Sequence, residues 1–271
     1  MKVKDKVIVV TGGGNGLGRE LVLNLLSKGA KVITIDINES ALQETVVRAG
    51  TKNTSLKTFV IDITNKASIE ELVDKAIAQY GFVDGIINNA GIIQPFVKLN
   101  DLSYEAIDRV INVNLYGTLY ITKAFLPHLL SRPEAHIVNI SSMGGFISFP
   151  SQTIYGAAKA AVKIFTEGLY AELKDTFVNV TVVHPGAITT NIMANSGLDK
   201  PIIDIDSTKS QNNMALSASK AAEIIIRAIE RNKFRVTVGK DATFLDLMYR
   251  LNPRIATNFI GKMMKKTLAN M

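Results

Sequence analysis

The chain has 271 residues, of which 47% are hydrophobic and 20% charged, so it can bury a substantial core and is not typical of a disordered protein. It contains no cysteine and only three histidines, which excludes disulfides and thiolate metal sites and favours a metal-free protein. The formal net charge of +7 is confined to residues 231–271, which hold nine Lys and Arg against two Asp, and the remainder is neutral. Because the N-terminus lacks a signal-peptide pattern and no apolar run reaches membrane-spanning length, we expect a cytoplasmic protein.

Short apolar runs rich in β-branched residues alternate along the chain with segments of helical periodicity. Strands are predicted over 7–10, 32–35, 56–61, 85–87, 136–140, 178–183 and 235–238, and helices over 16–28, 39–48, 68–80, 103–130, 155–173 and 219–232. Continuous apolar strands are buried on both faces, which requires helices on both sides. We therefore expect an α/β fold with a doubly wound, parallel, seven-stranded sheet of the Rossmann type and a helical C-terminal tail. A single dinucleotide-binding and catalytic domain is expected over 1–239.

The first predicted strand runs into a glycine-rich turn in which a helix begins. Glycines allow the backbone to approach a pyrophosphate, and the free N–H groups of a helix N-terminus attract phosphates. The usual Gly-x-Gly-x-x-Gly spacing is absent, but the glycines fit Gly-x-x-x-Gly-x-Gly. The residues expected to cradle a dinucleotide are Gly12, Asn15, Gly16, Leu17 and Gly18. A tight connection without a ligand is the alternative.

Carboxylates end the second and third predicted strands. Asp36 lies about 20 residues beyond the glycine turn, where it can accept hydrogen bonds from adenosine ribose hydroxyls and would repel a 2′-phosphate. This favours NAD over NADP, although Asp36 could instead cap the following helix. Asp62 and Ile63 are expected beside the adenine, with Asp62 equally well explained as a turn residue.

Tyr155 and Lys159 are four residues apart at the start of a predicted helix, so their side chains share one face. A neighbouring ammonium favours the phenolate and lowers the pKa of a tyrosine from about 10. The pair could therefore exchange a proton with a carbonyl oxygen, although a surface lysine beside a half-buried tyrosine is a common chance arrangement.

Three other motifs follow predicted strands: Asn-Asn-Ala-Gly at 88–91, Ser-Ser at 141–142 and Pro-Gly at 185–186. A fourth, Asn-Val-Asn-Leu-Tyr-Gly at 112–117, lies within the predicted helix 103–130. With the glycine turn and the Tyr-x-x-x-Lys pair, the sequence resembles the short-chain dehydrogenase/reductase family over about residues 4–239. The resemblance implies an NAD-dependent alcohol dehydrogenase or carbonyl reductase that transfers a hydride between the nicotinamide and a ketone, aldehyde or secondary alcohol. It also implies a homodimer or homotetramer.

The resemblance further implies roles for individual residues. Tyr155 would be the general acid/base, and Lys159 would lower its pKa and hold the nicotinamide ribose. Ser142, preferred to Ser141 for its family-like spacing to Tyr155, would bind the substrate carbonyl, and Asn114, rather than Asn112, would hold a water that links Lys159 to solvent. Asn89, Ala90 and Gly91 would line the adenosine ribose side, with Asn89 partly structural. Pro185, Gly186, Ile188 and Thr190 would flank the nicotinamide.

Apolar side chains surround the expected nicotinamide position, and residues 187–217 are long enough to form a substrate lid. The apolar set is Ile93, Pro95, Phe96, Phe146, Ile147, Phe149, Ile188, Ile192, Met193 and Leu198. It predicts a lipophilic small-molecule substrate, with core packing as the alternative for about half of these residues.

The basic tail, residues 240–271, keeps apolar residues at helical spacing on both sides of Pro253, unlike most family members of this length. This pattern suits a helix that lies on an anionic membrane. It also suits a cap on the pocket of its own or a partner subunit, an attraction for anionic thioesters, or a helix packed on the body with its lysines in solvent. No nucleic-acid motif is present. A protein that binds NAD as a sensor or scaffold without turnover is the second functional hypothesis.

Overall fold

The computed structural model describes residues 1–190, 192–198 and 215–268, and its central element is a parallel β-sheet. Within these residues the sheet has seven strands in the order β3-β2-β1-β4-β5-β6-β9. Their bounds are β1 Val7–Thr11, β2 Lys31–Asp36, β3 Leu56–Val60, β4 Gly85–Asn88, β5 Ala135–Ile140, β6 Val178–Pro185 and β9 Arg235–Val238. All neighbouring strands pair in parallel, which confirms the predicted doubly wound fold.

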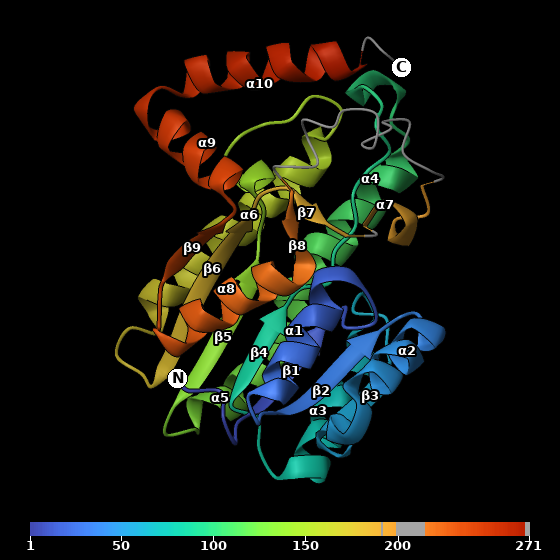
Figure 1. Ribbon diagram of the computed structural model, residues 1–271, viewed down its shortest axis with the longest axis vertical. Helices are drawn as coiled ribbons and strands as arrows, with labels where there is room; N and C mark the ends of the chain where they lie inside the picture. Colours follow the sequence, from blue (N-terminus) through green and yellow to red (C-terminus); the bar gives the residue numbers. More distant parts are fainter. Residues whose placement is uncertain (191, 199–214, 269–271) are drawn as a thin grey trace.

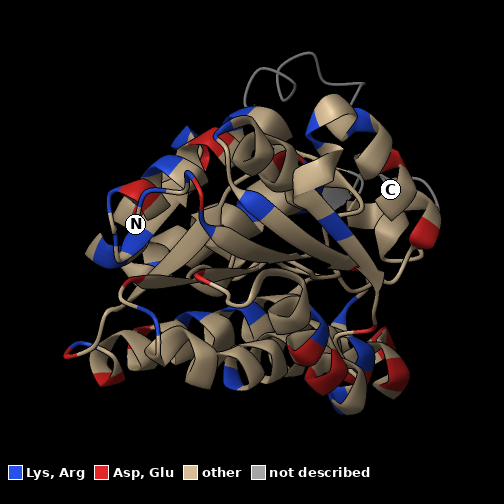
Figure 2. Ribbon diagram, turned by 90° about the horizontal axis from the view of Figure 1, so that it is seen from below, with Lys and Arg blue, Asp and Glu red and all other residues tan. Residues whose placement is uncertain are grey.

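Helices cover both faces of this sheet, so the molecule has three layers (Figure 2). The helices are α1 Gly16–Ser27, α2 Glu39–Ala49, α3 Lys66–Tyr80, α4 Tyr104–Ile111, α5 Gly117–Leu130, α6 Thr153–Glu172, α7 Ile192–Asn195, α8 Ala218–Glu230, α9 Lys240–Leu251 and α10 Pro253–Leu268. No described helix is both long and apolar enough to cross a membrane.

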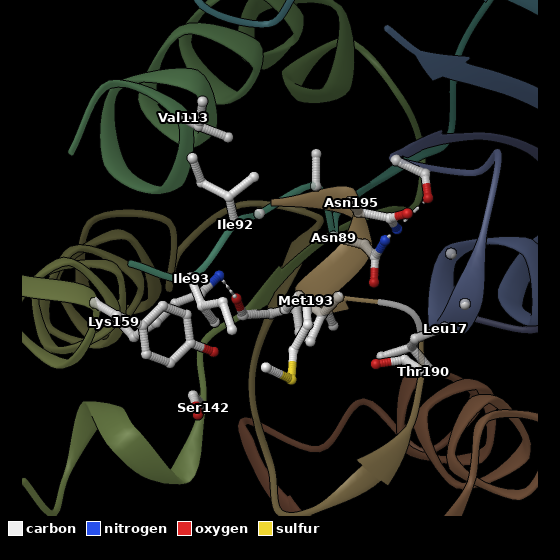
Figure 3. Close-up of a pocket in the computed structure, with 18 of the residues that line it drawn as sticks. Leu17, Asn89, Ile92, Ile93, Val113, Ser142, Lys159, Thr190, Met193 and Asn195 are labelled. Carbon is white, nitrogen blue, oxygen red and sulfur yellow. Dashed lines mark hydrogen bonds between the residues drawn. The ribbon is translucent and has the colours of Figure 1, made fainter. Parts of the chain in front are cut away.

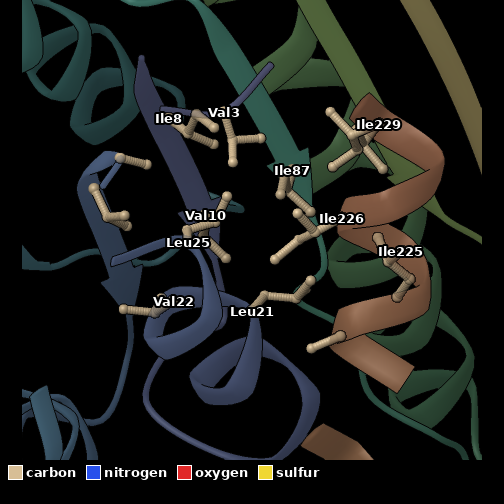
Figure 4. Close-up of a cluster of buried hydrophobic side chains, with 14 of the residues drawn as sticks. Val3, Ile8, Val10, Leu21, Val22, Leu25, Ile87, Ile225, Ile226 and Ile229 are labelled. Carbon is tan, nitrogen blue, oxygen red and sulfur yellow. The ribbon is translucent and has the colours of Figure 1, made fainter. Parts of the chain in front are cut away.

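Alternate side chains of the strands form two hydrophobic cores. Ile8 and Val10 of β1 pack against α1 and α8, where Leu21 and Ile226 are fully buried (Figure 4). The intervening residues of β1 belong to the core on the opposite face, with α3 and α5. Complete burial of each such aliphatic side chain contributes about 1.5–3 kcal/mol. The two cores hold the carboxyl ends of the strands at one edge of the sheet.

Several elements differ from the sequence prediction. The helix predicted over 103–130 contains a π-helical turn, Asn112–Tyr116, between α4 and α5. There the Asn114 side-chain amide donates a hydrogen bond to the Val110 carbonyl oxygen at 3.0 Å. It competes for this oxygen with the backbone N–H groups of the helix, and such competition favours a local change of helix type. The edge strands β3 and β9 are only partly buried, because each has a strand on one side alone.

The predicted lid contains β7 Ile188–Thr189, helix α7 and β8 Leu216–Ser217, and β7 and β8 pair in parallel. The sequence did not indicate these two strands. Residue 191 and residues 199–214 of the predicted lid lie outside the described residues.

The tail forms a helical hairpin. Helix α9 ends at Leu251, and α10 begins at Pro253, because proline suits the first position of a helix. The hairpin packs on the segment after β5, in a small core of Phe146, Ile147, Leu245, Ala256 and Ile260. The domain boundary at residue 239 stays a prediction.

Candidate active site

A cavity of about 1160 Å³ lies at the carboxyl edge of the sheet, where ligands of doubly wound folds bind. Figure 3 shows Ser142 and Lys159 on one side of this cavity, and Leu17 and Thr190 on the other. Every residue predicted for the site lines the cavity except Asn114, which lies behind its wall. The structure therefore brings together residues that are up to 178 positions apart, from Gly12 to Thr190.

The glycine turn is fixed by close backbone contacts. A Cβ atom on Gly18 would lie 1.9 Å from the carbonyl oxygen of Gly12, so only glycine fits there. The Asn15 carboxamide accepts a hydrogen bond from the Gly16 N–H at 2.7 Å and caps α1. Such a turn leaves room for a pyrophosphate against the backbone.

Asn89 links two neighbouring strands of the sheet through hydrogen bonds, as its partly structural role predicts. Its amide donates to the carbonyl oxygen of Thr11 at 3.0 Å, and the Thr11 hydroxyl accepts from the N–H groups of Asn89 and Ala90 at 3.0 and 2.9 Å. These bonds tie the end of β4 to the end of β1. Thr11 is a residue that the sequence analysis missed.

The Asp36 carboxylate lies beside the glycine turn in the cavity wall. It accepts hydrogen bonds from the Gly14 and Asn38 N–H groups, each at 3.0 Å. Arg19, which directly follows the turn, is buried and its guanidinium is bound to Glu44 at 2.7 and 2.8 Å. Because of this pairing, Arg19 lowers the pKa of Glu44 and is not available to a phosphate beside Asp36.

Asp62 serves as a turn residue and also lines the cavity. One carboxylate oxygen accepts from the N–H and the hydroxyl of Thr64, both at 2.8 Å. Ile63 is buried against Gly117, at which a Cβ atom would lie only 2.5 Å from the Ile63 side chain. The turn role left open for Asp62 is therefore observed, and its place beside an adenine stays a prediction.

The two serines after β5 have different surroundings. Ser141 is buried, and its hydroxyl donates to the Lys159 carbonyl at 2.7 Å. The Ser142 hydroxyl accepts from the Gly144 N–H at 3.0 Å, which leaves its own proton free to donate. This geometry favours Ser142, rather than Ser141, as the residue that can bind a ligand.

Tyr155 lies on the first turn of α6, half-buried in the cavity wall. Burial raises the pKa of its phenol, and a hydrogen bond with Ser142 opposes this effect. The sequence analysis expected the opposite direction, from the charge of Lys159. In the structure the Lys159 ammonium donates to the Ile140 carbonyl at 2.9 Å, so desolvation dominates the pKa of Tyr155.

Lys159 is buried, and burial lowers its pKa to about 8. Asn114 holds the neighbouring loop: its amide donates to the Ile92 carbonyl at 2.8 Å, and its oxygen accepts from the Ile92 N–H at 3.1 Å. A Cβ atom on Gly91 would lie 2.6 Å from that oxygen and 3.2 Å from the Lys159 ammonium. Glycine at 91 thus lets Asn114 and Lys159 approach the same point.

Comparison with known proteins agrees with this geometry. A family model, short chain dehydrogenase, matches residues 6–201. SadH of Mycobacterium tuberculosis, an oxidoreductase by name, is 35% identical over 256 residues, covering 92% of this chain and 91% of SadH. This chain belongs to the short-chain dehydrogenase/reductase family.

Solved structures of the family show the same fold. A short chain dehydrogenase/reductase from Burkholderia phymatum in complex with NAD has a TM-score of 0.79 at 29% identity, covering 88% of this chain and 90% of that one. A short chain dehydrogenase from Burkholderia cenocepacia in complex with NADP has a TM-score of 0.78 at 26% identity, covering 96% and 99%. The chain is therefore a family oxidoreductase whose relatives bind either dinucleotide.

The short-chain dehydrogenase cleft has an apolar end. Of the predicted apolar set, these residues line it: Ile93, Phe96, Phe149, Ile188, Ile192 and Met193. Phe146 and Ile147 instead belong to the small core under the tail, and Pro95 and Leu198 lie outside the wall. Met264 of α10 lines the cavity as well, so the tail contributes a side chain to the wall of the cleft.

The lid is bonded to both sides of the cleft. The Asn15 amide donates to the Asn195 carboxamide oxygen at 3.3 Å, beside the glycine turn. The Ser196 hydroxyl accepts from the Ile93 N–H at 3.0 Å. The described part of the lid therefore spans the cofactor end and the apolar end of the cleft.

Three positioning residues have no signal in the sequence. Buried Gln94 accepts from the N–H groups of Ile154 and Tyr155 at 2.8 and 3.1 Å, and thereby caps α6. His184 contacts the Ser142 carbonyl oxygen at 3.1 Å through Nδ1, and burial lowers the pKa of this histidine to about 4. The Asp241 carboxylate accepts from the Ala187 N–H at 2.7 Å.

Proposed function

We propose that this short-chain dehydrogenase/reductase uses NAD to interconvert a lipophilic ketone or aldehyde and the corresponding alcohol. The observation that carries the NAD preference is the Asp36 carboxylate beside the glycine turn, with Arg19 already bound to Glu44. A carboxylate there accepts the ribose hydroxyls of NAD and repels the 2′-phosphate of NADP. The backbone cradle around Gly12 and Gly18 fits a pyrophosphate, and bound NAD would supply the hydride.

The proton chemistry is assigned to Tyr155. Because burial raises its pKa, the phenol is protonated at neutral pH and can donate its proton to a carbonyl oxygen. The Ser142 hydroxyl, fixed by the Gly144 N–H, donates a hydrogen bond to the same oxygen. In the reverse direction, the phenolate accepts the proton of an alcohol.

Lys159 stabilises the phenolate and holds the nicotinamide ribose in this proposal. With a pKa of about 8, it is predominantly an ammonium at pH 7, and its proton is exchangeable near that pH. Asn114, which lies behind the wall beside Gly91, would hold the water that connects this ammonium to solvent. Pro185, Gly186, Ile188 and Thr190 would enclose the nicotinamide.

The activity test compares NADH with NADPH for a panel of carbonyl compounds, including a long-chain ketone and acetoin, by absorbance of the reduced nicotinamide. We expect turnover with NADH and a preference for the long-chain ketone. Tyr155→Phe should lose turnover and keep NAD affinity within about twofold, since it removes only the phenol oxygen. Preference for acetoin would refute the lipophilic substrate, and absence of NAD binding would refute the proposal altogether.

The cofactor preference has its own test. Asp36→Ala removes the acceptor and should lower kcat/KM for NADH about tenfold or more while raising that for NADPH. Asp62→Ala, which changes a carboxylate nearby in the wall, is the matched control and should keep the preference for NADH. If Asp36→Ala leaves the ratio of kcat/KM for NADH to that for NADPH unaltered, the argument for NAD is refuted.

The alternative of a sensor or scaffold makes a different prediction. A Tyr155→Phe protein that is fully active in the cell would favour that function. We also propose that the protein is cytoplasmic and forms a homodimer or homotetramer. Large apolar side chains are exposed on α4, on the π-helical turn that follows it and on α6, namely Tyr104, Tyr116, Ile164 and Tyr170, and they would support the assembly. Light scattering of the purified protein tests the assembly, and a monomer would refute it.

A further inference from the structure

The tail hairpin has an apolar outer face. It consists of Phe244, Leu247, Leu251, Ile255 and Phe259, with exposed fractions of 55%, 59%, 78%, 61% and 43%. The rings of Phe244 and Phe259 contact edge-on at 6.4 Å between centroids, so the two helices form one surface. Figure 1 shows α10 across the end of the molecule farthest from α3. Exposed apolar patches of this kind mark interaction sites.

Basic side chains lie along the border of the outer face. This basic rim consists of Lys240, Arg254, Lys262 and Lys265, all exposed, and none of them forms an ion pair within the described part of the chain. The lysines at 262 and 265 and the arginine at 254 lie on one side of α10, adjacent to its apolar stripe.

The acidic residues of the hairpin are engaged elsewhere. Asp246 forms a bidentate pair with Arg235, at 2.7 and 2.8 Å, and Asp241 accepts from the Ala187 N–H. No carboxylate of the described hairpin is therefore left to neutralise the rim. A second copy docked on this face would bring two basic rims together, and like charges disfavour that arrangement. An anionic surface has the complementary charge.

The opposite side of the hairpin faces the substrate cleft. Leu245, Ala256 and Ile260 pack against Phe146 and Ile147, and Met264 lines the cavity. Helix α10 is therefore a thin wall, with the cleft on one side and the outer face on the other.

We propose that the outer face docks on an anionic phospholipid bilayer, with its apolar side chains among the acyl chains and the basic rim on the headgroups. An amphipathic helix with a basic border binds lipid by these two contributions together. For the lipophilic substrate of the proposed function, on which this consequence rests, the cleft then lies beside the phase in which that substrate dissolves. The docking itself requires no turnover.

The test measures co-sedimentation of the full chain with vesicles of phosphatidylcholine alone and of phosphatidylcholine mixed with phosphatidylserine. Binding is expected with the mixed vesicles and should weaken at high salt, because the Debye length shortens. Each basic residue near an anionic surface changes the partition coefficient about fivefold. Lys262→Gln/Lys265→Gln should therefore lower binding about 25-fold.

The matched control is Lys52→Gln/Lys57→Gln, which removes the same charge from two exposed residues, one just before β3 and one within it. It should change binding less than about twofold, since those residues are far from the bilayer. Leu251→Ser/Ile255→Ser removes apolar contacts of the outer face, without touching the small core, and should lower binding about tenfold or more. Circular dichroism and the thermal midpoint check that all three variants are folded.

Three results would overturn the proposal. The first is equal sedimentation with the two kinds of vesicle, and the second is an equal loss in the Lys262/Lys265 and Lys52/Lys57 variants. The third is an absence of vesicle binding together with self-association that Leu251→Ser/Ile255→Ser abolishes, which would identify a second copy as the occupant. Because the readout is sedimentation, an enzyme that fails the carbonyl panel can still pass this test.

Discussion

Lys159 should make the folding stability of this protein depend on pH above neutrality. Its pKa falls from 10.5 to about 8 because the ammonium is buried in the cleft wall. A tenfold change in a protonation equilibrium is worth about 1.4 kcal/mol, so the buried charge costs about 3 kcal/mol of stability at neutral pH. The unfolded chain binds more protons than the folded one between pH 8 and 10.5, and stability therefore rises with pH across this range.

The perturbation is Lys159→Met, which keeps an unbranched side chain only one atom shorter and removes the titrating group. The free energy of unfolding of the wild type should increase, relative to this variant, by about 2 kcal/mol between pH 7 and 9.5. The variant also loses the hydrogen bond to the Ile140 carbonyl. This loss changes the free energy of unfolding by a similar amount at every pH, so it affects the pH dependence much less.

Urea unfolding of both proteins, at one protein concentration and several pH values, measures this difference. The two buried histidines contribute little above pH 7, because burial lowers the pKa of His136 to about 3 and that of His184 to about 4. Parallel stability curves for the two proteins would show that the Lys159 ammonium is not destabilised by burial. The exchangeable proton assigned to this lysine would then lose its support.

Three other predictions concern positioning groups. Gly18→Ala should abolish NAD binding, measured by calorimetry, because its Cβ atom would overlap the Gly12 carbonyl; retained affinity would refute the turn geometry. Gln94→Ala should lower kcat about tenfold or more with the NAD dissociation constant unchanged, since the N-terminus of α6 beneath Tyr155 loses its acceptor; an equal change in both would refute a positioning role. The folded pKa of His184 lies below its ordinary value of 6.5, so stability should fall as pH falls from about 6.5 to 4, by about 3 kcal/mol from this residue. Acid unfolding should lose this component in His184→Gln, and an identical profile in the variant would exclude it.

Local patterns were sufficient to predict the sheet and most of the cavity wall. The apolar runs could be assigned because strands buried on both faces contain few polar residues, and the glycine turn because a pyrophosphate requires close backbone approach. These signals also predicted that Asp36, Ser142 and Tyr155 would meet at one edge, since parallel strands present their carboxyl ends together.

Other features depend on contacts that no local pattern encodes. Gln94 caps a helix that begins 59 residues later, and Met264 reaches the cleft from the end of the chain. The sequence predicted a lowered pKa for Tyr155, and this was wrong because burial raises it. Four-residue spacing shows which charges are near a side chain, but it does not show how much water the fold removes from around it. The strands β7 and β8 are too short to leave a periodic signal.

Met264 lies far along the chain from the motifs assigned to hydride and proton transfer. The family model ends at residue 201, after the cofactor turn and the Tyr-x-x-x-Lys pair, yet part of the wall of the apolar end comes from residue 264. Replacement of the last thirty or so residues could therefore change which molecules enter while the hydride and proton machinery keeps its sequence. In evolution or in protein engineering, we therefore expect substrate range to be adjustable through the tail.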